Sequence, residues 1–166
     1  MPKYISILLV AVLPMLSQAA ETGNDRWNLQ DLYPSLAAWN ADAATLEGQL
    51  KQFDRCRGQL GSSVKRFKAC LDLHADLRKR YVRLSSYSSQ LHDEDTGAAT
   101  GLQLNQRADV IGSRVEQTTS FVHPEVLRIG AARISQFLAQ DKSLAIYRHP
   151  LDEILRFAPH TLSAQG

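Results

Sequence analysis

The stretch SSVKRFKACLDLHADLRKRYVRLSSYSSQLH, residues 62–92, decides the fold of this chain. Its apolar and aromatic residues recur at spacings of three and four, which is the period of one helix face. Arg, Lys and Asp residues fill the positions between them and are expected to face water. The pattern predicts one long amphipathic helix from Ser62 or Ser63 to about His92. Its apolar stripe is Val64, Phe67, Leu71, His74, Leu77, Tyr81, Leu84, Tyr87 and Leu91.

A shorter helix is predicted just before this one. Ser35 follows Pro34 and can cap its N-terminus, because a serine hydroxyl accepts hydrogen bonds from the free amides of a first turn. The helix should run to about Arg55 and be ended by Gly58 and Gly61. The buried face of the shorter helix is expected to hold Leu36, Trp39, Ala43, Leu46, Leu50 and Phe53.

Helical patterns continue after the connector 93–97, whose Asp95 or Thr96 can cap the next helix. This third helix is expected to bury Leu104, Ala108, Ile111, Val115, Thr118 and Val122. After the proline at 124, short helices are predicted over 125–129 and 132–140.

The last clear helix is expected to carry Leu144, Tyr147, Leu151, Ile154 and Leu155, to be interrupted by Pro150 and to stop at Pro159. Thr161 or Ser163 would cap a further helix. The sequence shows no convincing strand pattern, so we predict an all-α fold of long antiparallel helices.

The N-terminus has the pattern of a secretory signal peptide. Lys3 precedes the apolar run 5–16, and the small residues Ser17 and Ala19 follow at the spacing that signal peptidase requires. A run of twelve apolar residues interrupted by Pro14 is too short for a membrane anchor. The expected organisation is a signal peptide over 1–19, an extended segment over 20–34 and a helical region over 35–166. We expect an exported protein, periplasmic or secreted.

Charge and hydropathy narrow the range of partners. The formal net charge is +2 at pH 7, which gives no reason to expect nucleic acid or an anionic membrane as a partner. No stretch after the signal peptide is apolar enough to cross a bilayer, so no membrane contact is expected of the mature form.

Cys56 and Cys70 lie fourteen residues apart. If the two helices around them form a hairpin, the two cysteines lie on either side of its turn. In an oxidising compartment such a pair can form a disulfide, and export favours that interpretation. Two buried free thiols are the alternative. No Cys/His cluster has the spacing of a zinc site.

A search for catalytic residues finds none that can be named. The five histidines are too far apart in the sequence for a zinc-binding helix, and H-E-x-x-H is absent. His74 lies on an apolar stripe, where a core histidine is more common than a ligand. The acidic run 93–95 is best explained as a solvated turn, although paired carboxylates can bind a hard cation. Tyr81 and Tyr87 fit core positions, or the lining of a groove if the long helix borders one.

Four stretches together resemble one family. WNLQDLYPSLAAWNAD (27–42) is similar to the opening of oligoendopeptidase F-type proteins. LSSY (84–87) with DEDT (93–96) resembles the turn after that family's second long helix. SFVHPEVLRIG (120–130) and YRHPLDEILRFAPHTLS (147–163) are similar to its next segments. The resemblance covers about residues 27–165 and preserves the family's order.

The resemblance implies the N-terminal helical region of a thimet-like zinc oligopeptidase, which walls a channel for short peptides. In that family zinc polarises the scissile carbonyl and its bound water attacks, assisted by the glutamate of H-E-x-x-H. That motif lies hundreds of residues further on, so no catalytic or metal residue is carried over to this chain. The chain is expected to stop before the catalytic domain, its implied partner, and to be inactive without it. The alternative is a self-standing exported helical module for binding or scaffolding.

Overall fold

The structure, a computed structural model, describes residues 27–157, and the regular secondary structure within this range is entirely helical. The all-α class is therefore confirmed. Three long helices come first: α1 (Leu36–Phe53), α2 (Val64–Glu94) and α3 (Ala99–Thr119). Three short ones follow: α4 (Val122–Ile129), α5 (Ala131–Gln140) and α6 (Arg148–Arg156). Single 3-10 segments precede α1, follow it and precede α6: η1 (Leu29–Asp31), η2 (Asp54–Cys56) and η3 (Lys142–Tyr147).

The signal peptide predicted over 1–19 falls outside the described range. So do the predicted helix end at Pro159 and the predicted cap at Thr161 or Ser163. Within residues 27–157, no helix combines the length and the apolarity needed to cross a membrane.

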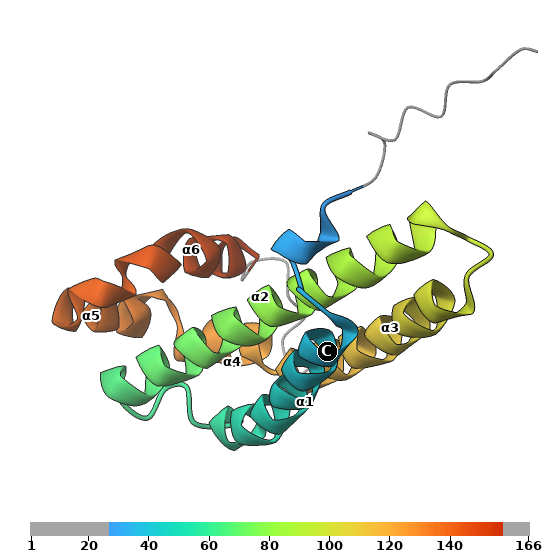
Figure 1. The fold of residues 1–166 in the computed structure, drawn as a ribbon. Coiled ribbons are helices and arrows are strands. Elements are labelled where there is room, and N and C mark those ends of the chain that lie inside the picture. The colour runs from blue at the N-terminus through green and yellow to red at the C-terminus, as the bar shows by residue number, and fades with distance from the viewer. Residues whose placement is uncertain (1–26, 158–166) are drawn as a thin grey trace, which may run out of the picture.

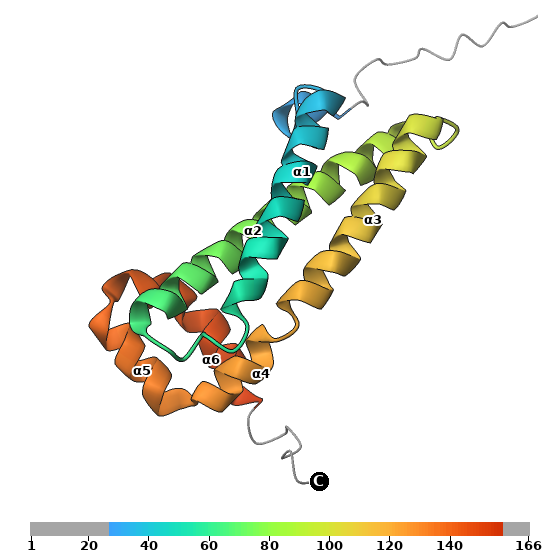
Figure 2. The same cartoon turned by 90° about the horizontal axis from the view of Figure 1, so that it is seen from below.

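The helices form two groups, seen in Figures 1 and 2. The long α2 pairs with α3 as an antiparallel hairpin, and α1 lies along both. The short helices α4, α5 and α6 gather around the N-terminal end of α2. One hydrophobic core runs through both groups. Its largest fully buried side chains are Trp39, Phe53, Phe67, Phe137, Leu46, Leu60, Leu77, Leu84, Ile111, Ile134, Leu144 and Leu151.

The two predicted N-caps are confirmed. The Ser35 hydroxyl accepts a hydrogen bond from the N–H of Ala38 at 3.2 Å. Ser63 does the same for Arg66 at 3.1 Å. These bonds satisfy amides that have no partner inside the helix, and they fix where α1 and α2 begin.

The predicted disulfide is present. It joins Cys56 of η2 to Cys70 in the second turn of α2, with the two Cα atoms 5.9 Å apart. It therefore closes the loop between α1 and α2. The alternative of two free thiols is set aside.

The third helix departs from the prediction at both ends. Neither Asp95 nor Thr96 caps it: Ala98 occupies the N-cap position and makes no side-chain cap. The Asp95 carboxylate instead accepts from the N–H of Gly97 at 3.0 Å and stabilises the turn itself. At the other end, α3 stops at Thr119, and the buried Val122 begins α4.

Pro124 lies in a first helical turn, as predicted, and Pro150 lies in a first turn as well. α4 begins at Val122, three residues before the predicted start at residue 125. Pro124 is its third residue, where the missing N–H breaks no helical hydrogen bond. Pro150 likewise is the third residue of α6 and does not interrupt it. Leu36 was predicted on the buried face of α1, but 40% of its surface is exposed.

Candidate functional site

An apolar groove of about 760 Å³ lies between α2, α4, η3 and α6. We call it the α2–α6 groove. Its apolar lining includes Leu71, Val122, Ile146, Leu151, Ile154 and Phe157. The groove also presents His74, Arg78, His123 and His149. Ile146 and Phe157 are 73% and 60% exposed, which is unusual for side chains of this size.

A hydrogen bond between two elements holds one wall of the groove. The Tyr147 hydroxyl of η3 donates to the Asp72 carboxylate of α2 at 2.6 Å. Lys68 donates to the other oxygen of Asp72 at 2.5 Å. Partial burial acts against the ionised form of Asp72, but these two hydrogen bonds outweigh it and lower its pKa. Burial and the bond to Asp72 raise the pKa of Tyr147 to about 12, so the phenol remains a donor at neutral pH.

His74 connects the groove to the core. Its ring stacks on Phe53 with centroids 5.6 Å apart and planes 20° from parallel. Burial, together with the charges of Arg78 and His123, lowers the pKa of His74 to about 4. The ring is therefore neutral at pH 7. His74 lies at the edge of the core and is only partly buried, whereas a core position was predicted.

The histidines of the groove do not form a metal centre. Within residues 27–157, no group of three or more His, Cys, Asp or Glu side chains is placed to hold a metal ion. His74, His123 and His149 line the same groove, but they do not converge on one point with a carboxylate. The residues that the structure describes therefore do not fit zinc.

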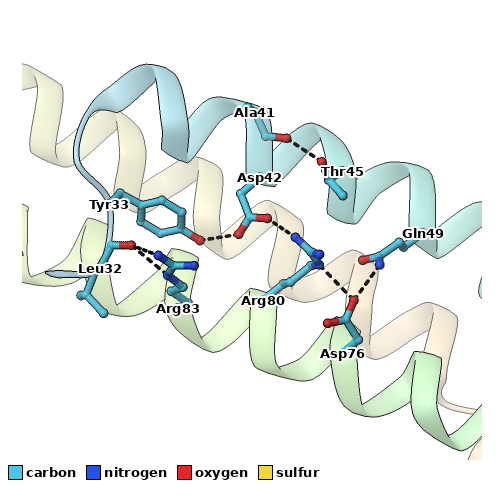
Figure 3. A network of polar contacts seen from close by, with 9 residues as sticks. All are labelled: Leu32, Tyr33, Ala41, Asp42, Thr45, Gln49, Asp76, Arg80 and Arg83. Carbon is cyan, nitrogen blue, oxygen red and sulfur yellow. Dashed lines mark hydrogen bonds and ion pairs between the residues drawn. The ribbon is translucent and has the colours of Figure 1, made fainter. Parts of the chain in front are cut away.

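A polar network links the N-terminal segment, α1 and α2 (Figure 3). The Tyr33 hydroxyl donates to Asp42 of α1 at 2.6 Å, and Asp42 also pairs with Arg80 of α2. Arg80 continues the network by donating to Asp76 at 3.0 Å. Hydrogen bonds from Gln49 and then from Arg80 lower the pKa of Asp76. The network therefore fixes the position of α1 relative to α2.

The structure places Tyr81 and Tyr87 in different surroundings. Tyr87 is buried, meets Tyr33 edge-on at 5.5 Å, and lines a smaller hollow at the turn between α2 and α3. Tyr81 packs on α3, where a Cβ atom added to Gly112 would collide with the Tyr81 ring and hydroxyl. Neither tyrosine lines the α2–α6 groove. A role for either in a peptide channel stays a prediction.

The acidic run 93–95 lies at the end of the α2–α3 hairpin. Glu94 accepts from the backbone N–H of Trp27 at 3.0 Å, and Asp95 accepts from Gly97. All three side chains are exposed. A solvated turn that also anchors the entering N-terminal segment explains these contacts.

Sequence and structure comparisons agree on one family. The family model described as Oligopeptidase F matches residues 125–166. Oligopeptidase PepF of Bacillus subtilis (strain 168) is 29% identical over 139 residues, which cover 84% of this chain and 21% of that protein. Group B oligopeptidase PepB of Streptococcus agalactiae serotype III is 24% identical over 83% of this chain and 23% of its own length.

The crystal structure of oligoendopeptidase-F from Enterococcus faecium contains a region of similar fold. Its TM-score is 0.71 at 25% identity, over 79% of this chain and 26% of that one. The chain thus spans about a fifth to a quarter of the length of the relatives it matches. In both fold and sequence, this chain is similar to the N-terminal region of oligoendopeptidase F-type peptidases.

Proposed function

We propose that this chain forms a helical wall of the substrate channel in an exported zinc oligopeptidase that hydrolyses short peptides. The observation that carries the proposal is the match in both fold and sequence to one part of oligoendopeptidase F, at a TM-score of 0.71. The three long helices suit a wall, because they share one hydrophobic core and the network from Tyr33 to Gln49 joins α1 to α2. Such a wall would narrow the channel, so that short, unfolded peptides enter it and folded proteins do not.

The proposal assigns no catalytic step to this chain. H-E-x-x-H is absent from its sequence, and the residues that the structure describes do not fit zinc. In the whole enzyme, zinc would polarise the scissile carbonyl of the peptide and activate the attacking water. This chain would form one side of the channel and pack against the part of the enzyme that carries the metal.

Peptide hydrolysis tests this proposal. The purified chain should neither cleave a fluorescence-quenched peptide nor bind stoichiometric zinc. When it is mixed with the remainder of B. subtilis oligopeptidase PepF, lacking the region that this chain matches, cleavage should appear and a chelator should abolish it. The remainder without this chain is the matched control. Chelator-sensitive cleavage by this chain on its own would contradict the proposal.

Export is the second part of the proposal. It is supported by the signal-peptide pattern of residues 1–19 and by the Cys56–Cys70 disulfide, since structural disulfides persist mainly in oxidising compartments. Expression in a Gram-negative host followed by fractionation tests it. We expect periplasmic protein whose mass corresponds to cleavage after Ala19. Intact protein confined to the cytoplasm would refute export and leave the channel-wall proposal untouched.

A further inference from the structure

The α2–α6 groove exposes large apolar side chains of the kinds that are buried in the core elsewhere in the chain. The helix α6 buries Leu151 completely, whereas Ile154 and Leu155 are only half-buried. Ile146 and Phe157 stand beside them with most of their surface exposed. Within residues 27–157, the apolar face of α6 is therefore only partly covered, which is typical of a helix face that packs against another segment.

We propose that the α2–α6 groove docks a helix of the polypeptide that follows this region in the longer oligoendopeptidase F-type proteins. This inference rests on the proposed function. The matched relatives are four to five times longer than the segment they share with this chain, so they hold ample polypeptide to cover the groove.

The position of the groove in the chain supports this occupant. The family match runs from residue 125 to residue 166 and includes the residues of η3 and α6 that line the groove. Phe157, the last described residue, is itself part of the lining, so the polypeptide leaves the described range at the groove. In the longer relatives, polypeptide that continues from this position is covalently attached beside the surface that we propose it covers.

The charges of the groove specify the chemistry of the docked helix. Arg78 projects into the groove and makes no ion pair within residues 27–157. Glu153 is already paired with Arg156 on its own helix. The docked helix should present apolar residues to Leu71, Ile146 and Phe157, and a carboxylate to Arg78.

Binding to the remainder of B. subtilis oligopeptidase PepF, measured by sedimentation velocity and calorimetry, tests the docking. We expect a one-to-one complex with the full chain. Ile146→Asp and Phe157→Asp should each weaken it by about tenfold or more, because each puts a charge against an apolar surface. Arg78→Glu should also weaken it. The matched control is Val110→Asp on α3, which changes a valine that is 53% exposed and outside the groove lining.

Circular dichroism of each variant establishes that the fold is intact, which the exposure of Ile146 and Phe157 leads us to expect. Equal affinities for the groove variants and Val110→Asp would overturn the inference, as would the absence of any complex. Groove variants that abolish self-association of this chain, yet bind the PepF remainder normally, would show an interface between copies and equally overturn it.

Hydrolysis in the same mixtures separates this inference from the proposed function. A groove-dependent complex that does not cleave peptides supports docking and contradicts the channel-wall function. A cleaving complex that ignores the groove substitutions supports the function and contradicts docking.

Discussion

The carboxylate of Glu125 accepts a hydrogen bond from the backbone N–H of Leu60 at 3.3 Å, so a side chain of α4 holds the loop between α1 and α2. Its second oxygen accepts from the N–H of Gly58 in the same loop. Glu125 is buried, and Cys56 ties the start of this loop to α2 through the disulfide. The loop is thus fixed from two directions.

Replacing Glu125 tests how much its contacts with the loop stabilise the fold. Glu125→Gln keeps the shape but leaves one carbonyl oxygen where two acceptors were needed. We expect the free energy of unfolding to fall by about 1–3 kcal/mol, the cost of an unsatisfied buried donor. Urea denaturation measures this. Glu116→Gln on the exposed face of α3 is the control and should change little. Equal stability of both variants would show that the bonds to the loop contribute nothing.

The turn between α2 and α3 depends on a glycine. A Cβ atom added to Gly101 would lie 2.8 Å from the Cα of His92, and that backbone cannot move aside cheaply. We expect Gly101→Ala to destabilise the fold by about 1–3 kcal/mol, in the range of overpacked sites. Gly48→Ala on α1 is the control, because nothing lies within 4 Å of the added atom. It should stabilise by up to about 1 kcal/mol, since alanine is the better helix former. A thermal melt in which both variants behave alike would contradict the close approach.

His74 predicts how stability depends on pH. Its pKa is about 4 in the folded chain, against an ordinary value of 6.5, so the unfolded chain binds more protons between these two values. Stability is therefore full above pH 6.5 and falls as the pH drops toward 4, by about 3 kcal/mol at most.

His74→Phe keeps an aromatic ring against Phe53 and removes the titration. Its urea midpoint should fall less between pH 6.5 and pH 4 than that of the parent, whereas exposed His149→Gln should keep the full fall. Parallel curves for His74→Phe and the parent would show that His74 is not the titrating group.

The disulfide should contribute substantially to stability. Closing a loop of fourteen residues stabilises by about 3 kcal/mol in the chain-entropy model. The Cys56→Ala, Cys70→Ala double variant should unfold at correspondingly lower urea concentration, and reductant should affect the parent only. Mass spectrometry of unreduced exported protein provides the direct check. Two alkylatable thiols in that sample would contradict the bridge.

The long helices could be predicted from the sequence because local patterns determine them. The stripe from Phe67 to Tyr87 has a helical period, and Ser35 and Ser63 are capping residues directly before apolar faces. The meeting of Cys56 and Cys70 could be predicted because a hairpin brings the ends of its turn together. Each of these inferences needs only residues close in the sequence.

The features that could not be predicted depend on distant contacts. In the sequence, Glu125 cannot be told from a surface carboxylate, because its contact with the N–H of Leu60 forms only when α4 packs against the loop. Val122 fits the periodicity of α3, yet Ser120 and Phe121 turn the chain before it. The α2–α6 groove unites residues from 71 to 157, so no single segment indicates it. Tyr81 and Tyr87 share a stripe, but α3 covers one and the N-terminal segment meets the other.

A chimera tests most directly whether this chain is the wall of an oligopeptidase. In it, the matched region of B. subtilis oligopeptidase PepF is replaced by residues 27–166 of this chain, so that docking affinity does not limit assembly. We predict a folded chimera that cleaves a quenched short peptide, loses this activity with a chelator and leaves folded proteins intact. A chimera that folds and binds zinc yet cleaves no peptide would contradict the proposed function.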